Sequence, residues 1–275
     1  MPIRPGVEAR PGVEARPGSA ARPGGRVPTV VVAVTCLAWA VSIGAESGGS
    51  APMFGHGHLA EGGLSPVAVI ALFAISWQVM LAAMMLPSSI GMLDAFGRLA
   101  RTQTHPVRVQ ALFVTAYLGV WTVFGLAAFG GDALLHDLVH SSPWLHRHQW
   151  TVGGAVLVAA GAFQFSSIKD RCLTECRTPV GFLVERYRPG AWAAFRVGIA
   201  HAAFCLGCCW ALMLVAFAAG AGNLVWMGVI TTIMVVERTV SWGATVVRPV
   251  GALLVVLGVL VMAHPAGFPA VLGPS

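Results

Sequence analysis

The stretch "HAAFCLGCCWALMLV", residues 201–215, decides the fold class because it is apolar almost throughout. It lies within a longer apolar segment, 194–219, whose one formally charged residue is Arg196. A helix needs about 20 apolar residues to cross the hydrocarbon core of a bilayer. The segment therefore predicts a transmembrane helix, and it places Cys205, Cys208 and Cys209 inside the membrane.

The composition of the whole chain agrees with a membrane protein. Of 275 residues, 56% are hydrophobic and only 10% are charged, and the mean hydropathy is +0.76. Soluble domains carry roughly 25% charged residues. The sequence predicts an all-α, polytopic helical membrane bundle with the lipid bilayer as its partner. The sequence pI is about 9.4, but the arginines flank apolar segments, so a nucleic-acid partner is not expected.

Seven apolar segments are candidates for transmembrane helices, and the sixth is short. The first is read as an anchor, because its apolar region exceeds the roughly 7–15 residues of a signal peptide. The segments are 27–45, 66–90, 107–131, 150–168, 194–219, 223–237 and 245–263.

The positions of the basic residues predict the orientation. With seven spans and a cytoplasmic N-terminus, all seventeen Lys and Arg residues except Arg147 fall on the inside or at its edge. Cytoplasmic loops are enriched in such residues. We therefore expect a bacterial inner (plasma) membrane protein with its N-terminus in and its C-terminus out. Residues 1–26 are expected to form a disordered Arg/Pro/Gly-rich cytoplasmic tail, 27–264 a single transmembrane domain, and 265–275 a short outer tail.

Helical spacing puts several soft ligands on one stripe of the 194–219 helix. His201 and Cys205, Cys205 and Cys209, and Cys209 and Met213 are each four residues apart, and Cys208 lies three residues after Cys205. We predict that this stripe binds a metal ion.

A second cysteine pair lies in the predicted inner loop that follows the fourth span. Cys172 and Cys176 occur in "DRCLTECR", 170–177, at a spacing that puts both thiols on one face if the loop is helical. The cytoplasm keeps thiols reduced, so a structural disulfide is not expected. We expect the basic neighbours Lys169, Arg171 and Arg177 to favour the thiolate form, which binds metal.

Further candidates lie in other segments. Met80 and Met84 share a face of the second predicted helix, near the helix-kinking Pro87. Gln164 and Glu237 are predicted to be structural, with Glu237 paired to Arg238 at the interface. Outer residues are predicted to gather metal as accessory ligands: Met53, His56, His58, His136 and His140.

Thiolate and thioether ligands select Cu(I), so a copper site is the preferred hypothesis, with zinc possible. The chain is then expected to be a binding or transfer protein rather than an enzyme, which moves the ion by ligand exchange and serves a metallochaperone or a metalloprotein client. Two alternatives stay open. "CLGC", 205–208, has the C-x-x-C spacing of a thiol–disulfide oxidoreductase, and an assembly factor for a metalloenzyme would use the same site.

The chain resembles an uncharacterised bacterial family described as predicted metal-binding integral membrane proteins. The resemblance covers roughly residues 65–260 and implies a membrane-embedded metal site. Its motifs are "WQVMLAAMMLP" (77–87), "GAFQFSSIKDRCLTECRTP" (161–179), "HAAFCLGCCWALM" (201–213), "NLVWM" (223–227) and "ER" (237–238). The chain departs from the family pattern at Phe163, where Tyr is common, at Gly222, where Met is common, and at Arg238, where Lys is common.

Overall fold

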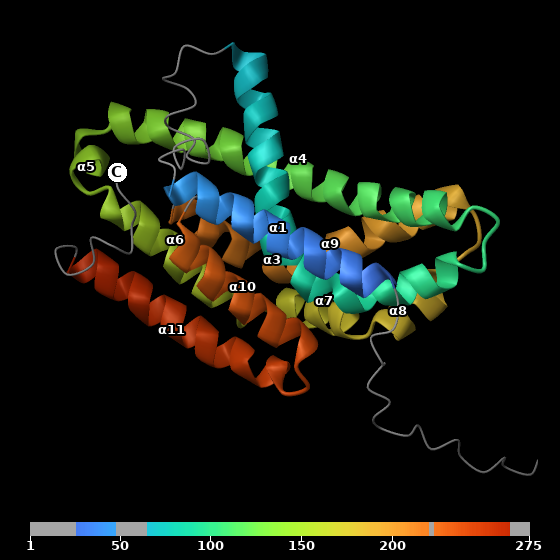
Figure 1. The fold of residues 1–275 in the computed structure, drawn as a ribbon. Helices are drawn as coiled ribbons and strands as arrows, with labels where there is room; N and C mark the ends of the chain where they lie inside the picture. The colour runs from blue at the N-terminus through green and yellow to red at the C-terminus, as the bar shows by residue number, and fades with distance from the viewer. Residues whose placement is uncertain (1–25, 48–64, 220–222, 265–275) are drawn as a thin grey trace, which may run out of the picture.

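The computed structural model describes residues 26–47, 65–219 and 223–264, which contain ten helices and no strand. Figure 1 shows them gathered into one bundle, which confirms the predicted all-α helical architecture. The helices are α1 (Arg26–Ser47), α3 (Pro66–Ala100), α4 (Pro106–Ser141), α5 (Pro143–Arg147), α6 (Trp150–Phe163), α7 (Ser167–Arg177), α8 (Pro179–Arg186), α9 (Ala191–Ala218), α10 (Leu224–Thr239) and α11 (Gly243–Ala263).

Among the described residues, five helices are long and apolar enough to cross a membrane: α1, α3, α4, α9 and α11. A sixth crossing is obtained if α6 and α7 together form one bent span. Helix α10 has 16 residues, fewer than the roughly 20 that a crossing needs. The number of seven spans and the orientation of the termini therefore stay predictions. The predicted tails 1–26 and 265–275 lie outside the described residues, apart from Arg26.

The predicted span 150–168 is not a single straight helix, because the chain bends by 67° between α6 and α7. Ser166 caps the new helix, with its Oγ accepting a hydrogen bond from the Lys169 backbone N at 3.1 Å. Serine favours this position because its hydroxyl satisfies a backbone N–H that has no partner within the helix. The predicted inner loop with the second cysteine pair is consequently helix α7, which packs against α9.

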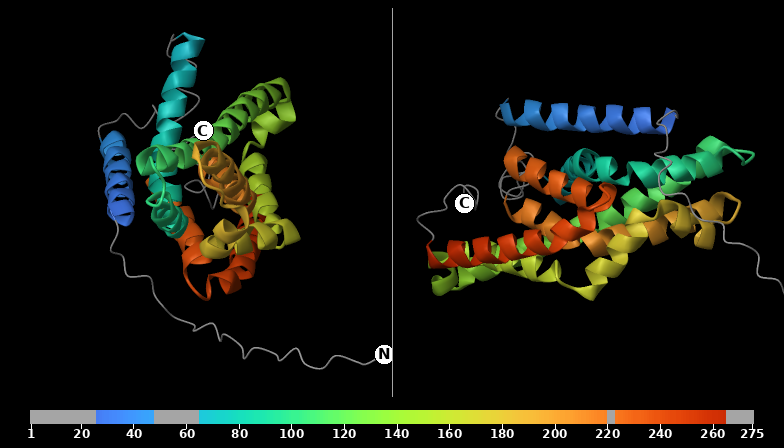
Figure 2. Two further views of the ribbon diagram at one scale, coloured as in Figure 1. Left: turned by 90° about the vertical axis from the view of Figure 1, so that its right-hand side faces the viewer. Right: turned by 90° about the horizontal axis from the view of Figure 1, so that it is seen from below.

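Helices α6 and α11 lie side by side and approach closely through facing glycines (Figure 2). A Cβ atom on Gly161 would lie 2.6 Å from the Gly251 backbone O, and one on Gly258 would lie 2.6 Å from the Gly154 backbone O. Small residues allow membrane helices to approach in this way, and backbone contact replaces the hydrophobic effect, which is absent in lipid.

The contact predicts a specific effect of Gly161→Ala. We expect it to lower the free energy of unfolding by about 1–3 kcal/mol, because the added methyl group overlaps the α11 backbone. Gly119→Ala in α4 is the matched control, since a Cβ atom there meets nothing within 4 Å. Reversible unfolding in detergent micelles checks the difference. Equal stability of the two variants would contradict the contact.

Helix α9 forms the centre of the bundle, where it packs against α4, α6, α7 and α10. Helix α1 lies along one side of the bundle and packs on α3 (Figure 2). Because α9 is surrounded, its cysteine stripe faces protein rather than lipid. The bundle thereby buries the three thiols of this helix.

Candidate metal centre

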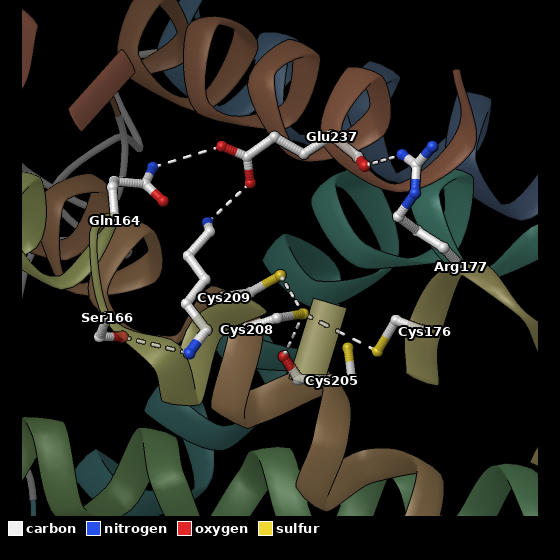
Figure 3. A network of polar contacts seen from close by, with 9 residues as sticks. Gln164, Ser166, Cys176, Arg177, Cys205, Cys208, Cys209 and Glu237 are labelled. Carbon is white, nitrogen blue, oxygen red and sulfur yellow. Dashed lines mark hydrogen bonds and ion pairs between the residues drawn. The ribbon is translucent and has the colours of Figure 1, made fainter. Parts of the chain in front are cut away.

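Four thiols from two helices meet in the core (Figure 3). Cys205, Cys208 and Cys209 come from α9, and Cys176 comes from α7. The Cys208 Sγ lies 3.3 Å from the Cys209 Sγ and 3.8 Å from the Cys176 Sγ. All four side chains are buried, with at most 7% exposed. These four residues are called the thiol cluster below. The fold brings Cys176 to the other three from a different helix.

Cys172 lies beside the cluster and is more accessible. It is half-buried and stands one helical turn before Cys176 on α7. Its Sγ lies 2.5 Å from the position that a Cβ atom on Gly207 would take. Glycine at position 207 therefore makes room for this thiol directly against the α9 backbone.

Arg238 of α10 contacts the thiol cluster, which overturns its predicted pairing with Glu237. Its Nη1 donates to the Cys205 Sγ at 3.2 Å and to the Ser88 Oγ at 2.8 Å. The residue is only 5% exposed. Neighbouring residues on a helix do not face each other, so Glu237 and Arg238 reach different partners.

Glu237 instead accepts from α7 and from the segment before it. Lys169 Nζ donates to the Glu237 Oε2 at 2.7 Å, and Gln164 Nε2 donates to the Oε1 at 3.3 Å. Both charged side chains are 1% exposed. This buried ion pair joins α7, the helix that carries Cys176, to α10.

The expectation that Lys169 and Arg177 favour the thiolates of the second cysteine pair is therefore wrong. Lys169 is engaged by Glu237. Arg177 donates to the backbone carbonyls of Glu237, Val240 and Ser241, the last two at 2.8 and 2.9 Å. A cation at the C-terminus of α10 satisfies carbonyl groups that the helix leaves free.

The rest of the surroundings of Cys205 is aromatic and polar. The Tyr117 hydroxyl of α4 lies 3.2 Å from the Cys205 Sγ and 3.2 Å from the Ser89 Oγ. The His201 ring lies over Tyr117, with ring centroids 5.5 Å apart and planes at 19°. His201 is 2% exposed, and neither ring nitrogen has a hydrogen-bond partner within the described part of the chain. A buried imidazole without partners is costly unless something else binds it.

The other predicted ligands that the structure describes divide between the core and the exposed end of α4. Met80, Met84 and Met213 are buried in the same core cluster as the thiols, and their role as ligands stays a prediction. Pro87 lies inside α3 as expected. His136 and His140 lie with ring centroids 4.3 Å apart on the exposed end of α4, and a metal-gathering role for them also stays a prediction. Met53, His56 and His58 lie outside the described residues.

Residues 26–47, 65–219 and 223–264 contain no group of three or more His, Cys, Asp or Glu side chains already arranged to hold a metal ion. The Cys208 Sγ nevertheless has two other sulfur atoms close to it, Cys209 at 3.3 Å and Cys176 at 3.8 Å. Closely spaced soft ligands in an enclosed core suit a soft ion that needs few ligands.

Three residues of the site have roles that the sequence did not predict: Tyr117 was not singled out, and Arg238 and Lys169 were assigned other partners. Arg238 and Tyr117 contact Cys205 directly, and Lys169 holds the helix that carries Cys176. One signal for them existed: Lys169 is the chain's one lysine, and Arg238 ends an apolar segment. Ionisable residues in membrane segments are rare and are commonly functional.

Fold and site together define a helical membrane protein with a buried thiol cluster suited to a soft metal. The chain belongs to the PpoB2 copper chaperone family, whose model matches residues 74–261 and thus includes the whole thiol cluster. The family description indicates a copper-related role. No curated protein and no solved structure matches the chain.

Proposed function

We propose that the chain binds Cu(I) at the thiol cluster within the bacterial inner membrane and passes it by ligand exchange to a metalloprotein client. The observation that carries the proposal is the meeting of Cys176 from α7 with Cys205, Cys208 and Cys209 from α9. All four thiols are buried in one place, and the packing of helices does not require four cysteines together. The description of the matching family as a copper chaperone family supports copper as the metal.

The chemistry of the site suits Cu(I) better than zinc. Soft thiolate ligands select Cu(I), whereas a structural zinc site takes four ligands in a closed tetrahedron. A low-coordinate ion can be held by two or three neighbouring thiols, such as Cys208 with Cys209 and Cys176. The neutral imidazole of His201, which lacks a hydrogen-bond partner in the described residues, is available as a further ligand.

A path for ligand exchange follows from the graded burial of the cysteines. Cys172 is half-buried, and Cys176 stands one turn further along α7 and is 7% exposed. The next thiol is Cys208, 3.8 Å from Cys176 and 1% exposed. An ion held by two ligands can bind the next thiol before it leaves the previous one. No step along this path then requires a bare ion in the apolar core.

Copper titration of the purified, reduced protein in detergent, without oxygen, tests the proposal. We expect one tightly bound Cu(I) per chain in competition with a coloured chelator, and much weaker binding of Zn(II). Cys172→Ser is expected to keep the equilibrium affinity and to slow transfer to a second chelator, because it removes only the accessible thiol. A folded, fully reduced protein that takes up no Cu(I) would overturn the proposal.

A further inference from the structure

Arg238 is a buried cation for which the structure offers no carboxylate. Its side chain is surrounded by α3, α9 and α10, and it contacts the Ser88 Oγ and the Cys205 Sγ. The ion pairs within the described residues involve Arg98, Lys169 and Arg186, and none involves Arg238. The adjacent Glu237 is already neutralised by Lys169.

A buried charge is costly unless another charge compensates it. The groups next to Arg238 that can carry negative charge are the thiols of the cluster, with the Cys205 Sγ at 3.2 Å, and the Tyr117 hydroxyl, which contacts the same sulfur. One fixed positive charge, the Arg238 guanidinium, therefore lies against the thiol cluster before any metal binds. That charge contributes to the total charge of every complex that forms there.

We propose that Arg238 determines which ionic charge the thiol cluster accepts, so that it selects monovalent soft cations over divalent ones. This inference rests on the proposed function. Each thiol that binds metal releases its proton to water. Two thiolates, one monovalent cation and the Arg238 guanidinium together are neutral. With a divalent cation held by the same two thiolates, the complex carries one uncompensated positive charge in the core, and a third thiol would have to lose its proton to neutralise it.

Arg238 also joins α10 to α3 through Ser88, and a purely structural role has to be distinguished from a role in charge. A structural role depends on hydrogen bonds and shape, so loss of Arg238 would weaken every metal equally. If Arg238 acts through its charge, its loss changes the affinities for monovalent and divalent ions in opposite directions. Removal of the guanidinium leaves the monovalent complex anionic and makes the divalent complex neutral.

Ag(I) and Cd(II) are suitable probes, because both are soft and neither changes its oxidation state with the thiols. The variants are Arg238→Gln, which removes the charge, Arg238→Lys, which keeps it, and Ser88→Ala, which removes a hydrogen bond only. We expect Arg238→Gln to weaken Ag(I) binding by roughly tenfold or more and to raise the ratio of Cd(II) to Ag(I) affinity. Arg238→Lys and Ser88→Ala are expected to keep both affinities within a few-fold of wild type.

The results separate this inference from the proposed function. A wild-type protein that binds neither Ag(I) nor Cu(I) would refute both. If the wild type binds Ag(I) but Arg238→Gln leaves the affinity ratio unchanged, or weakens both metals equally, the charge inference alone is overturned. Should Arg238→Gln fail to fold, the double variant Arg238→Met, Ser88→Ala replaces it, since it removes both polar partners together.

Discussion

Cys208→Ser is expected to lower the Cu(I) affinity of the protein about 100-fold or more. The Cys208 sulfur lies 3.3 Å from the Cys209 sulfur on α9 and 3.8 Å from the Cys176 sulfur on α7. Its loss therefore removes a ligand that is close to thiols of both helices. A serine hydroxyl is a hard ligand that does not replace thiolate for a soft ion. Competition with a Cu(I) chelator in detergent measures the affinity.

Cys36→Ser is the matched control for this substitution. Cys36 is the one remaining cysteine of the six in the chain, and it is exposed on α1, away from the thiol cluster. We expect it to bind Cu(I) as the wild type does, with the same number of ions per chain. If Cys208→Ser and Cys36→Ser bind copper equally well, the thiol cluster is not the copper site.

Lys169→Met is expected to lower the free energy of unfolding by about 3–5 kcal/mol, because it leaves the buried Glu237 carboxylate without its cation. Among the residues that the structure describes, Gln164 then remains as the one hydrogen-bond donor to that carboxylate. The double variant Lys169→Met, Glu237→Leu is expected to recover most of the loss, since two apolar side chains can replace a buried ion pair at little cost. Reversible unfolding in micelles measures all three proteins.

The exposed pair of Arg98 and Asp94 provides the control. Its atoms are as close, at 2.6 Å, but the Arg98 side chain is 54% exposed. Arg98→Met is expected to cost only about 0–1 kcal/mol, because water already solvates both charges. A similar cost for Lys169→Met and Arg98→Met would show that the α7–α10 pair is not as enclosed as the structure has it.

The site was predictable where it depends on one helix and not where it depends on two. Helical spacing placed Cys205, Cys208 and Cys209 on one stripe, and the structure shows them together in the core. The same reasoning missed the contact between Cys205 and Arg238. That contact depends on how α10 is rotated relative to α9, which no spacing within either segment expresses.

The break between α6 and α7 shows a similar limit. The apolar run of 150–168 continues to Ile168, so hydropathy alone joins the two helices. The cap at Ser166 ends that continuity, and the bend turns α7 back onto α9. A loop at the membrane surface was expected, and a helix that contributes a fourth thiol was found.

The sequence by itself determined that this is an all-helical membrane protein with a stripe of soft ligands in one helix. Hydropathy and residue spacing act within a segment, so they can be read without knowledge of its neighbours. Only the tertiary structure decided that Cys176 reaches that stripe, that Lys169 pairs with Glu237, and that Arg238 contacts Cys205. These contacts join residues 32 to 68 positions apart, and they depend on which helices pack together and which faces they present.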